Sequence, residues 1–180
     1  NQTADDYEVI VVDDGSTDDT HERMEKINDD RLRFLQNREN MGQPYARNRG
    51  INEARGDIVI FVDSDVLVDR NFIKEHIEHH RRGDKLIVQG LVRHIKKVED
   101  YGMSTLMIDG LCLTGLITQN VSVRKKWLEE VGGFNESFGD AMGYMDVEIG
   151  RKLKAMGLKT IYAWRSCLAW HVDGYEDNDR

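Results

Sequence analysis

The chain is 180 residues long, with 39% hydrophobic and 32% charged residues, which suits one soluble domain with a sizeable core. Its 25 basic and 33 acidic residues give a net charge of −8, which argues against bulk binding to nucleic acid. No apolar run approaches the ~20 residues that cross a bilayer, and no signal peptide opens the chain, so we expect no membrane span. Cys112 and Cys167 belong to no C-x-x-C motif, so we expect reduced, buried thiols and a cytosolic protein.

The chain begins with a strand, an acidic turn and a helix. Residues 7–12 (YEVIVV) predict a buried strand, and Ser16 with Asp19 predicts a capping box for a helix over residues 17–28. Residues 31–35 (RLRFL) alternate in polarity, which predicts a half-exposed strand near the edge of a sheet.

A second helix leads into a second buried strand. Pro44 lies in the first turn of a helix that we expect to end near Arg55, with Gly56 as its stop. The five apolar residues of 58–62 then predict a strand buried on both faces of a largely parallel sheet. This alternation of strands and helices predicts parallel pairing through helical crossovers.

Two carboxylates, Asp63 and Asp65, follow this strand and are separated only by Ser64. Side chains two positions apart on an extended chain point the same way. Open α/β sheets bind their ligands at the carboxyl ends of the strands. Because paired carboxylate oxygens suit Mg²⁺ or Mn²⁺ carrying a phosphate, we expect a cation site here.

The remaining elements continue the alternation of helices and strands. The expected helices cover residues 70–82, 124–131 and 146–156, and the expected strands cover residues 85–89, 91–95, 117–123, 159–163 and 167–171. Residues 96–115 have no clean periodicity and predict a loop, and we expect the acidic tail after Tyr175 to fray. No repeat or linker composition interrupts the chain, which predicts a single domain over residues 1–180.

Several polar residues on these elements are candidates for ligand binding. Asp13 and Asp14 end the first strand, where a carboxylate either caps the helix or accepts hydrogen bonds from a ribose hydroxyl or a base N–H. Arg47 lies near a helix start, where a cation gains nothing from the helix dipole, so an anionic or carbonyl ligand is the alternative to a solvated side chain. Asp146 opens the helix of residues 146–156, where it either favours the dipole or acts as a base above a ligand pocket.

Histidines occur in two settings. His171 ends the last predicted strand and is a candidate to complete the ligand set of the carboxylate pair. His76, His79 and His80 have the helical spacing of metal ligands, but charged residues surround them, so we expect a solvated helix face.

Taken together, these residues resemble family 2 of the inverting glycosyltransferases, which have the GT-A fold. The resemblance rests on three blocks in the family's order: EVIVVDDGSTDDT, then NMGQPYARNRGINEARGDIVIFVDSD, then GLITQNVSVRKKWLEEVGGFNESF with MDVEIGRKLKAMG. The closing AWHV is similar to the strand-end histidine of metal-dependent members. The implied fold is α/β, a mixed, mainly parallel Rossmann-like sheet flanked by helices.

The resemblance implies a role for each candidate on the donor side. Asp14 would bind the uracil or ribose of a UDP-sugar, with Arg47 near the base, and Asp63 would hold ribose or sugar hydroxyls. Asp65 and His171 would ligate Mn²⁺ or Mg²⁺ on the diphosphate. Residues 1–95 would form the nucleotide-binding half.

On the acceptor side, the resemblance implies that Asp146 is the general base that deprotonates the acceptor hydroxyl. Residues 96–180 would form the acceptor-binding and catalytic-base half. The acceptor would be a carbohydrate, a lipid-linked molecule or another hydroxyl compound, handled in the cytoplasm or at the inner face of the membrane.

Two departures from the family pattern carry expectations of their own. Met145 precedes Asp146 where family members usually have Glu, so one acceptor-side contact is expected to differ. The family's first strand, which lies between the second and fourth strands, is not matched, so residues 7–12 and 57–62 are each expected to have an unpaired backbone edge.

Other functions fit parts of the same sequence. A nucleotidyltransferase also needs carboxylates and a metal, and a Rossmann dehydrogenase would need a G-x-G-x-x-G turn in the unmatched region. A non-catalytic fragment that binds nucleotide is the alternative from outside the enzymes. The three blocks together favour the glycosyltransferase.

Overall fold

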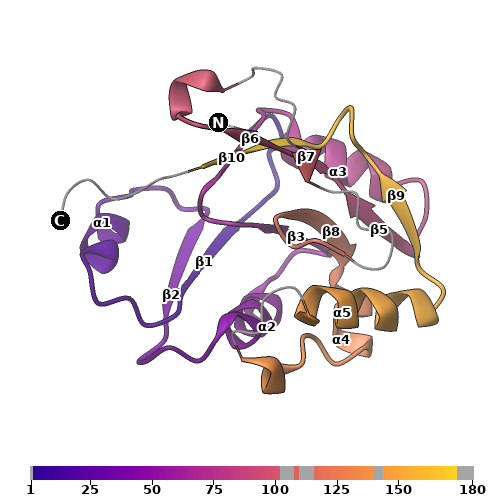
Figure 1. Ribbon diagram of the computed structural model, residues 1–180, viewed down its shortest axis with the longest axis horizontal. Coiled ribbons are helices and arrows are strands. Elements are labelled where there is room, and N and C mark those ends of the chain that lie inside the picture. The colour runs from indigo at the N-terminus through magenta and orange to yellow at the C-terminus, as the bar shows by residue number, and fades with distance from the viewer. Residues whose placement is uncertain (1, 102–107, 110–115, 140–143, 174–180) are drawn as a thin grey trace.

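The computed structural model describes residues 2–101, 108–109, 116–139 and 144–173 (Figure 1). The strands are β1 (Val9–Asp13), β2 (Leu32–Gln36), β3 (Ile58–Val62), β4 (Val66–Val68), β5 (Leu86–Gln89), β6 (Leu91–Ile95), β7 (Ile108–Asp109), β8 (Asn120–Arg124), β9 (Lys159–Tyr162) and β10 (Leu168–Val172). The helices are α1 (Thr20–Glu25), α2 (Gln43–Glu53), α3 (Phe72–His80), α4 (Lys125–Glu130) and α5 (Tyr144–Ala155), with short 3₁₀ turns η1 (Val98–Asp100) and η2 (Glu136–Phe138). Cys112, most of the loop expected over residues 96–115, and the tail after Tyr175 lie outside the described residues.

The strands form three hydrogen-bonded groups: β1 with β2, the order β3-β8-β5-β9, and the order β4-β10-β6-β7. Parallel pairs (β1 with β2, β5 with β9, β6 with β10) occur beside antiparallel ones (β3 and β5 with β8, β4 with β10, β6 with β7). The expected mixed α/β fold is confirmed, although antiparallel pairs outnumber parallel ones among the described strands. Among the described strands, β3 pairs with β8, which comes from the second half of the chain and runs antiparallel to it.

Two short turns move the chain from one sheet to the other. Asp63–Asp65 joins β3 to β4, and Gly90 alone joins β5 to β6. A Cβ atom on Gly90 would lie 2.3 Å from Oδ1 of Asn120, so only glycine fits this close approach. The sequence does not predict β4, a strand of three residues whose only described partner is β10.

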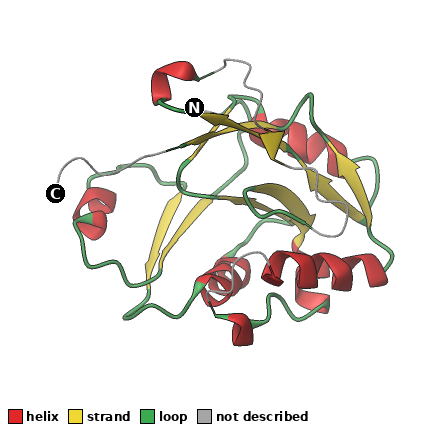
Figure 2. Ribbon diagram, in the orientation of Figure 1, coloured by secondary structure: helices red, strands yellow, loops and turns green. Residues whose placement is uncertain are grey.

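The core lies on both faces of the β3-β8-β5-β9 sheet, with helices outside it (Figure 2). Val121 and Val123 of β8 face the apolar cluster of α2, α4 and α5, to which Ile149 and Leu153 belong. Ser122 lies between them on the strand, so it points to the opposite face, where its hydroxyl meets histidines of α3. β8 is therefore buried on both faces.

β1 and β3 each have one edge without a strand partner among the described residues. β1 pairs with β2, and β3 pairs with β8, but no pairing joins β1 to β3. Their apolar ends are correspondingly open, since Val9 is 42% exposed and Val62 is 40% exposed. The expected unpaired edges are thus observed, and β3 is less buried than its apolar sequence predicts.

Two local expectations are wrong. The hydroxyl and the N–H of Ser16 bind the carboxylate of Asp13 instead of capping a helix, so α1 begins only at Thr20. The histidines of α3 are not a solvated face, because His76 and His80 are 0% and 1% exposed. Phe72 and these two histidines recur every four residues, which places them on the one helix face that packs against the sheets.

Candidate functional site

The carboxylate pair and the strand-end histidine meet because β4 pairs with β10. Val66 is the register partner of His171 in this antiparallel pair, and the N–H of Val172 donates to the carbonyl of Asp65 over 3.1 Å. This pairing brings Oδ2 of Asp65 to 3.1 Å from Nε2 of His171. Residues more than 100 positions apart in sequence thus face each other across one pair of hydrogen-bonded strands.

Asp146 lies in the first turn of α5, and Thr118 holds its carboxylate in place. Oδ2 accepts hydrogen bonds from the N–H of Thr118 at 3.1 Å and from its hydroxyl at 3.0 Å. Oδ1 lies 3.4 Å from Nη1 of Arg47. Only 16% of the Asp146 side chain is exposed, so the carboxylate is oriented rather than freely solvated.

Arg47 lies between the two acidic parts of the site. Its guanidinium is 3.4 Å from Asp146 and 3.8 Å from Oδ1 of Asp63, and its charge lies over the ring of Phe134. Arg47 links the strand-end acid Asp63 to Asp146 on α5, and its place on the base side of a nucleotide stays a prediction. One guanidinium can offset part of the repulsion between these carboxylates.

The charges around Asp63 favour a cation. Burial raises the pKa of Asp63, the nearby guanidinium of Arg47 lowers it, and the carboxylates of Asp65 and Asp146 raise it further. Three acids around one small volume are stabilised when a cation enters, since each carboxylate otherwise opposes the ionisation of the others.

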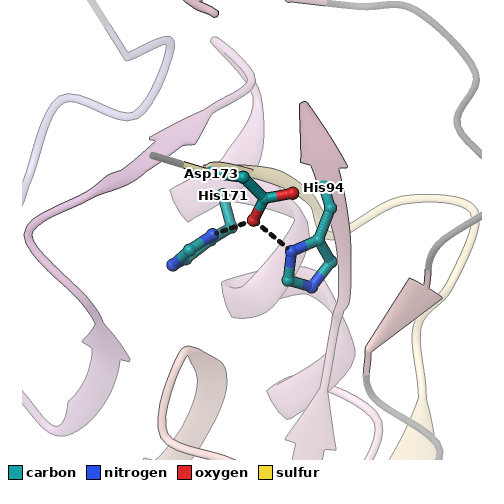
Figure 3. Close-up of side chains that lie close together, drawn as sticks. All are labelled: His94, His171 and Asp173. Atoms are coloured by element: carbon teal, nitrogen blue, oxygen red, sulfur yellow. Dashed lines mark hydrogen bonds and ion pairs between the residues drawn. The ribbon is translucent and has the colours of Figure 1, made fainter. Parts of the chain in front are cut away.

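His171 belongs to a second set of contacts on its far side (Figure 3). Nδ1 of His171 and Nδ1 of His94 lie 2.9 Å and 2.6 Å from the same oxygen, Oδ1 of Asp173. The hydrogen bond from His94 holds the pKa of Asp173 below its usual value, with His171 adding to the effect, so the carboxylate is ionised at neutral pH. These three side chains are spaced closely enough to hold a metal ion.

Asp14 lies at the end of β1, where the loop of residues 37–42 surrounds its carboxylate. Oδ1 accepts from Nδ2 of Asn37 at 2.6 Å and from the N–H of Met41 at 3.0 Å, and Oδ2 accepts from the N–H of Gly42 at 2.8 Å. The predicted nucleotide-binding residue therefore also holds the loop that leads into α2.

The residues present fit a hard or borderline divalent cation. Adjacent ligands of an octahedral ion with bonds of ~2.1 Å lie about 3 Å apart, and Asp65 and His171 offer an oxygen and a nitrogen at 3.1 Å. A carboxylate oxygen is a ligand that Mg²⁺ and Mn²⁺ both accept, and the imidazole adds a borderline nitrogen ligand.

Three residues of the site were not predicted. Asp173 carries a signal, because it follows His171 by two positions and so points to the same side of an extended chain. His94 lies in a correctly predicted strand, but its pairing with β10 has no local sequence signal. Thr118 precedes β8 in a turn, and nothing in its sequence neighbourhood points to Asp146.

Comparison with known proteins gives consistent matches. The model of the family described as "Glycosyl transferase family 2" matches residues 1–146. The uncharacterised glycosyltransferase YfnE of Bacillus subtilis is 43% identical over 86 residues, which are 47% of this chain and 22% of that protein. Glycosyltransferase GlyG of Streptococcus pneumoniae is 36% identical over 91 residues, which are 49% of this chain and 30% of that protein. The chain thus matches a third or less of the length of either relative.

Solved structures share the fold at low sequence identity. TarS 1-349 of S. aureus, in complex with UDP-GlcNAc, has a TM-score of 0.76 and 19% identity, covering 95% of this chain and 51% of that one. GalNAc-T7 with UDP, GalNAc and Mn²⁺ has a TM-score of 0.72 and 15% identity, covering 92% of this chain and 37% of that one. Within the described residues, no helix is both long and apolar enough to cross a membrane.

Proposed function

The chain belongs to glycosyl transferase family 2 and has the GT-A fold, and on this basis we propose that it transfers a sugar from a nucleotide-diphospho-sugar to an acceptor hydroxyl with inversion. UDP is the proposed nucleotide, because the structures of TarS and GalNAc-T7 that share the fold are complexes with UDP-GlcNAc and UDP respectively. The observation that carries the proposal is the meeting of Asp65 and His171 at 3.1 Å, at the end of an apolar strand.

On the donor side, Asp65 and His171 would hold Mn²⁺ or Mg²⁺, and Asp63 would accept hydrogen bonds from ribose or sugar hydroxyls. When bound, the cation stabilises the negative charge that develops on the departing diphosphate. Arg47 would contribute a second positive charge beside Asp63, which its distance of 3.8 Å supports. Asp14 would contact the uracil or ribose from the end of β1.

On the acceptor side, Asp146 would act as the general base. The acceptor hydroxyl gives its proton to this carboxylate while its oxygen attacks the anomeric carbon, and the bond from that carbon to the diphosphate breaks with its electron pair. The two hydrogen bonds from Thr118 support this role, because they hold Oδ2 and leave the orientation of the carboxylate defined. The acceptor would be a carbohydrate, a lipid-linked molecule or another hydroxyl compound.

Calorimetry with nucleotides tests the donor side. UDP, GDP, dTDP and NAD are titrated with and without Mn²⁺ into the wild-type chain, into Asp65→Ala and into Asp57→Ala. Asp57 is the matched control, since it is an exposed acid immediately before the same strand. We expect metal-dependent binding of UDP that Asp65→Ala weakens about 100-fold and Asp57→Ala leaves unchanged. Metal-independent binding of NAD would contradict the proposal.

A transfer assay tests the acceptor side. With radiolabelled UDP-GlcNAc and a mixture of hydroxyl acceptors, Asp146→Asn should lower the rate about 1,000-fold, because a general base contributes 10²–10⁴. Binding of UDP with Mn²⁺ should be retained in this variant. UDP binding by the wild type without any transfer would favour the non-catalytic nucleotide-binding alternative, and nucleotidyl transfer in its place would favour the nucleotidyltransferase.

A further inference from the structure

We propose that Asp173 is a positioning residue that holds the ring of His171 with Nε2 facing Asp65, and so prepares the cation site. The inference rests on the proposed function, because it concerns the side of His171 that faces away from the donor. The family resemblance implies roles for Asp65 and His171, and Asp173 and His94 are not among the residues it covers.

The contacts divide the two nitrogens of His171 between two acids. Nδ1 lies 2.9 Å from Oδ1 of Asp173, and Nε2 lies 3.1 Å from Oδ2 of Asp65. A histidine that ligates a metal almost always gives its other ring N–H to a carboxylate or carbonyl, which fixes the orientation of the ring. Asp173 occupies this position, and the ring is only 21% exposed, so it has little freedom to turn.

The strands hold Asp173 where this contact needs it. The N–H of Asp173 donates to the carbonyl of Ile95 over 2.7 Å, which continues the parallel ladder of β10 and β6 one residue beyond the end of β10. This hydrogen bond fixes the backbone of Asp173, although Asp173 comes after the last residue of β10. His171 and Asp173 are two residues apart, so their side chains lie on the same side of the chain.

His94 keeps the carboxylate oriented from the neighbouring strand. His94 and His171 are register partners in β6 and β10, and their ring centroids are 5.0 Å apart. Nδ1 of His94 lies 2.6 Å from the same Oδ1 that contacts His171. One oxygen thus receives two histidines, and the backbone bond from Asp173 to Ile95 also holds Asp173, so the positioning role predicts that its contact with His171 survives the loss of His94.

A rival arrangement uses the same three residues as metal ligands. One ligand atom each of His94, His171 and Asp173 lies within 4.8 Å of the others, which is close enough to share an ion. In that arrangement His94 would matter as much as Asp173. In the positioning role, His94 matters much less, because the contacts that orient His171 join Nδ1 to Asp173 and Nε2 to Asp65 without passing through His94.

The affinity for Mn²⁺ in the presence of UDP distinguishes the positioning role from the arrangement with three metal ligands. Electron paramagnetic resonance of free Mn²⁺ measures this affinity. Asp173→Ala should weaken Mn²⁺ binding about 30-fold, within the 10–100-fold range for such partners. Asp173→Asn retains an oxygen acceptor and should restore most of the affinity, and His94→Leu should change it less than about 3-fold. The melting temperature of the metal-free chain should be similar in all of these variants.

The Mn²⁺ affinities of these variants test the role of Asp173 separately from the proposed donor site. Equal losses in His94→Leu and Asp173→Ala, or an unchanged affinity in Asp173→Ala, would overturn the positioning role. Asp65→Ala and His171→Ala serve as references: if neither weakens Mn²⁺ binding, the proposed donor site itself is wrong. If both weaken it and Asp173→Ala does not, only the inference about Asp173 fails.

Discussion

Two pairs of histidines in this molecule are each bridged by a single oxygen, and the bridges differ. His94 and His171 share Oδ1 of Asp173, whereas His76 and His80 share the hydroxyl of Ser122. The first pair lies at the ends of β6 and β10 beside carboxylates. The second pair is buried between α3 and β8 among neutral partners. The chemistry of the bridging group, and not the spacing of the histidines, separates a candidate ligand from a structural residue.

The buried pair forms a hydrogen-bond chain in which the donor and acceptor of each bond can be assigned. Nδ2 of Asn120 donates to two backbone carbonyls, so its Oδ1 must accept from Nε2 of His76 at 3.1 Å. Nδ1 of His76 then accepts from the hydroxyl of Ser122 at 2.8 Å, and that hydroxyl accepts from Nε2 of His80 at 2.9 Å. His76 is therefore neutral in this chain, because Nε2 carries its one proton and Nδ1 accepts.

The burial of His76 and His80 favours their neutral forms. It lowers the pKa of His76 to about 3 and that of His80 to about 4. A buried neutral imidazole can bind metal only by giving up its partners, and both nitrogens of His76 are used. The carboxylate-bridged pair instead lies beside negative charge, which attracts a cation. The following substitutions test this difference, from the largest expected effect to the smallest.

Removal of a buried histidine should have the largest effect on stability. His76→Ala leaves Asn120 and Ser122 without a partner in the core and creates a cavity, so the free energy of unfolding should fall by about 4 kcal/mol. His171→Ala, at a partly exposed position, should lower it by about 1 kcal/mol or less. Urea denaturation of the two variants gives the comparison, and equal losses would contradict it.

Acid should destabilise the chain through the buried pair. The pKa values of His76 and His80 are lower in the folded chain than their ordinary value of 6.5, so the unfolded chain binds more protons below pH 6.5. Stability from these groups is present above pH 6.5 and is lost as pH falls, by about 1.4 kcal/mol per histidine per pH unit until the folded pKa is reached. Because both folded pKa values lie below 5, the free energies of unfolding from urea denaturation at pH 7 and pH 5 should differ by about 4 kcal/mol. A stability that is constant across this range would show that the pair is not neutral.

A substitution at the turn between β5 and β6 should disturb the buried chain from a distance. In Gly90→Ala the new Cβ would lie 2.3 Å from Oδ1 of Asn120, so that side chain must move away from His76. We expect a loss of about 2 kcal/mol in the free energy of unfolding. Gly83→Ala is the matched control, because its Cβ would meet Leu86 at an ordinary 3.5 Å. A loss in the control as large as that in Gly90→Ala would exclude this explanation.

His79, the third histidine of α3, should contribute least. Its Nε2 lies 3.0 Å from the hydroxyl of Ser166, and it lies outside the chain formed by Ser122. His79→Ala should lower the free energy of unfolding by about 0.5 kcal/mol, a typical value for one hydrogen bond near the surface. A thermal melt measures it, and a shift as large as that of His76→Ala would show that the three histidines act as one cluster.

The sequence predicts most elements and most of the candidate site, because apolar periodicity and capping residues are local signals. Asp63 and Asp65 follow a strand as expected, and α5 opens near Asp146. The role of the α3 histidines is not predictable in this way, since a polar residue is read as exposed unless its buried partner is known. That partner, Ser122, comes from a strand more than 40 residues later.

Contacts between strands far apart in the sequence account for the other features that the sequence does not predict. β4 exists as a strand because β10 pairs with it, and His94 meets Asp173 because β6 and β10 are parallel neighbours. Ser16 illustrates a local failure: its hydroxyl oxygen could accept from a backbone N–H at a helix start, or its O–H could donate to Asp13, and in the folded turn it donates to Asp13. Such competition depends on the geometry of the folded turn.

Pulsed electron paramagnetic resonance of the Mn²⁺ complex with UDP tests the central claim most directly, because it detects a histidine nitrogen bonded to the ion. We predict one nitrogen coupling in the wild type, which persists in His94→Leu and His79→Ala and disappears in His171→Ala. A coupling that survives in His171→Ala, or no coupling in the wild type, would contradict the assignment of His171 as the histidine that meets the cation.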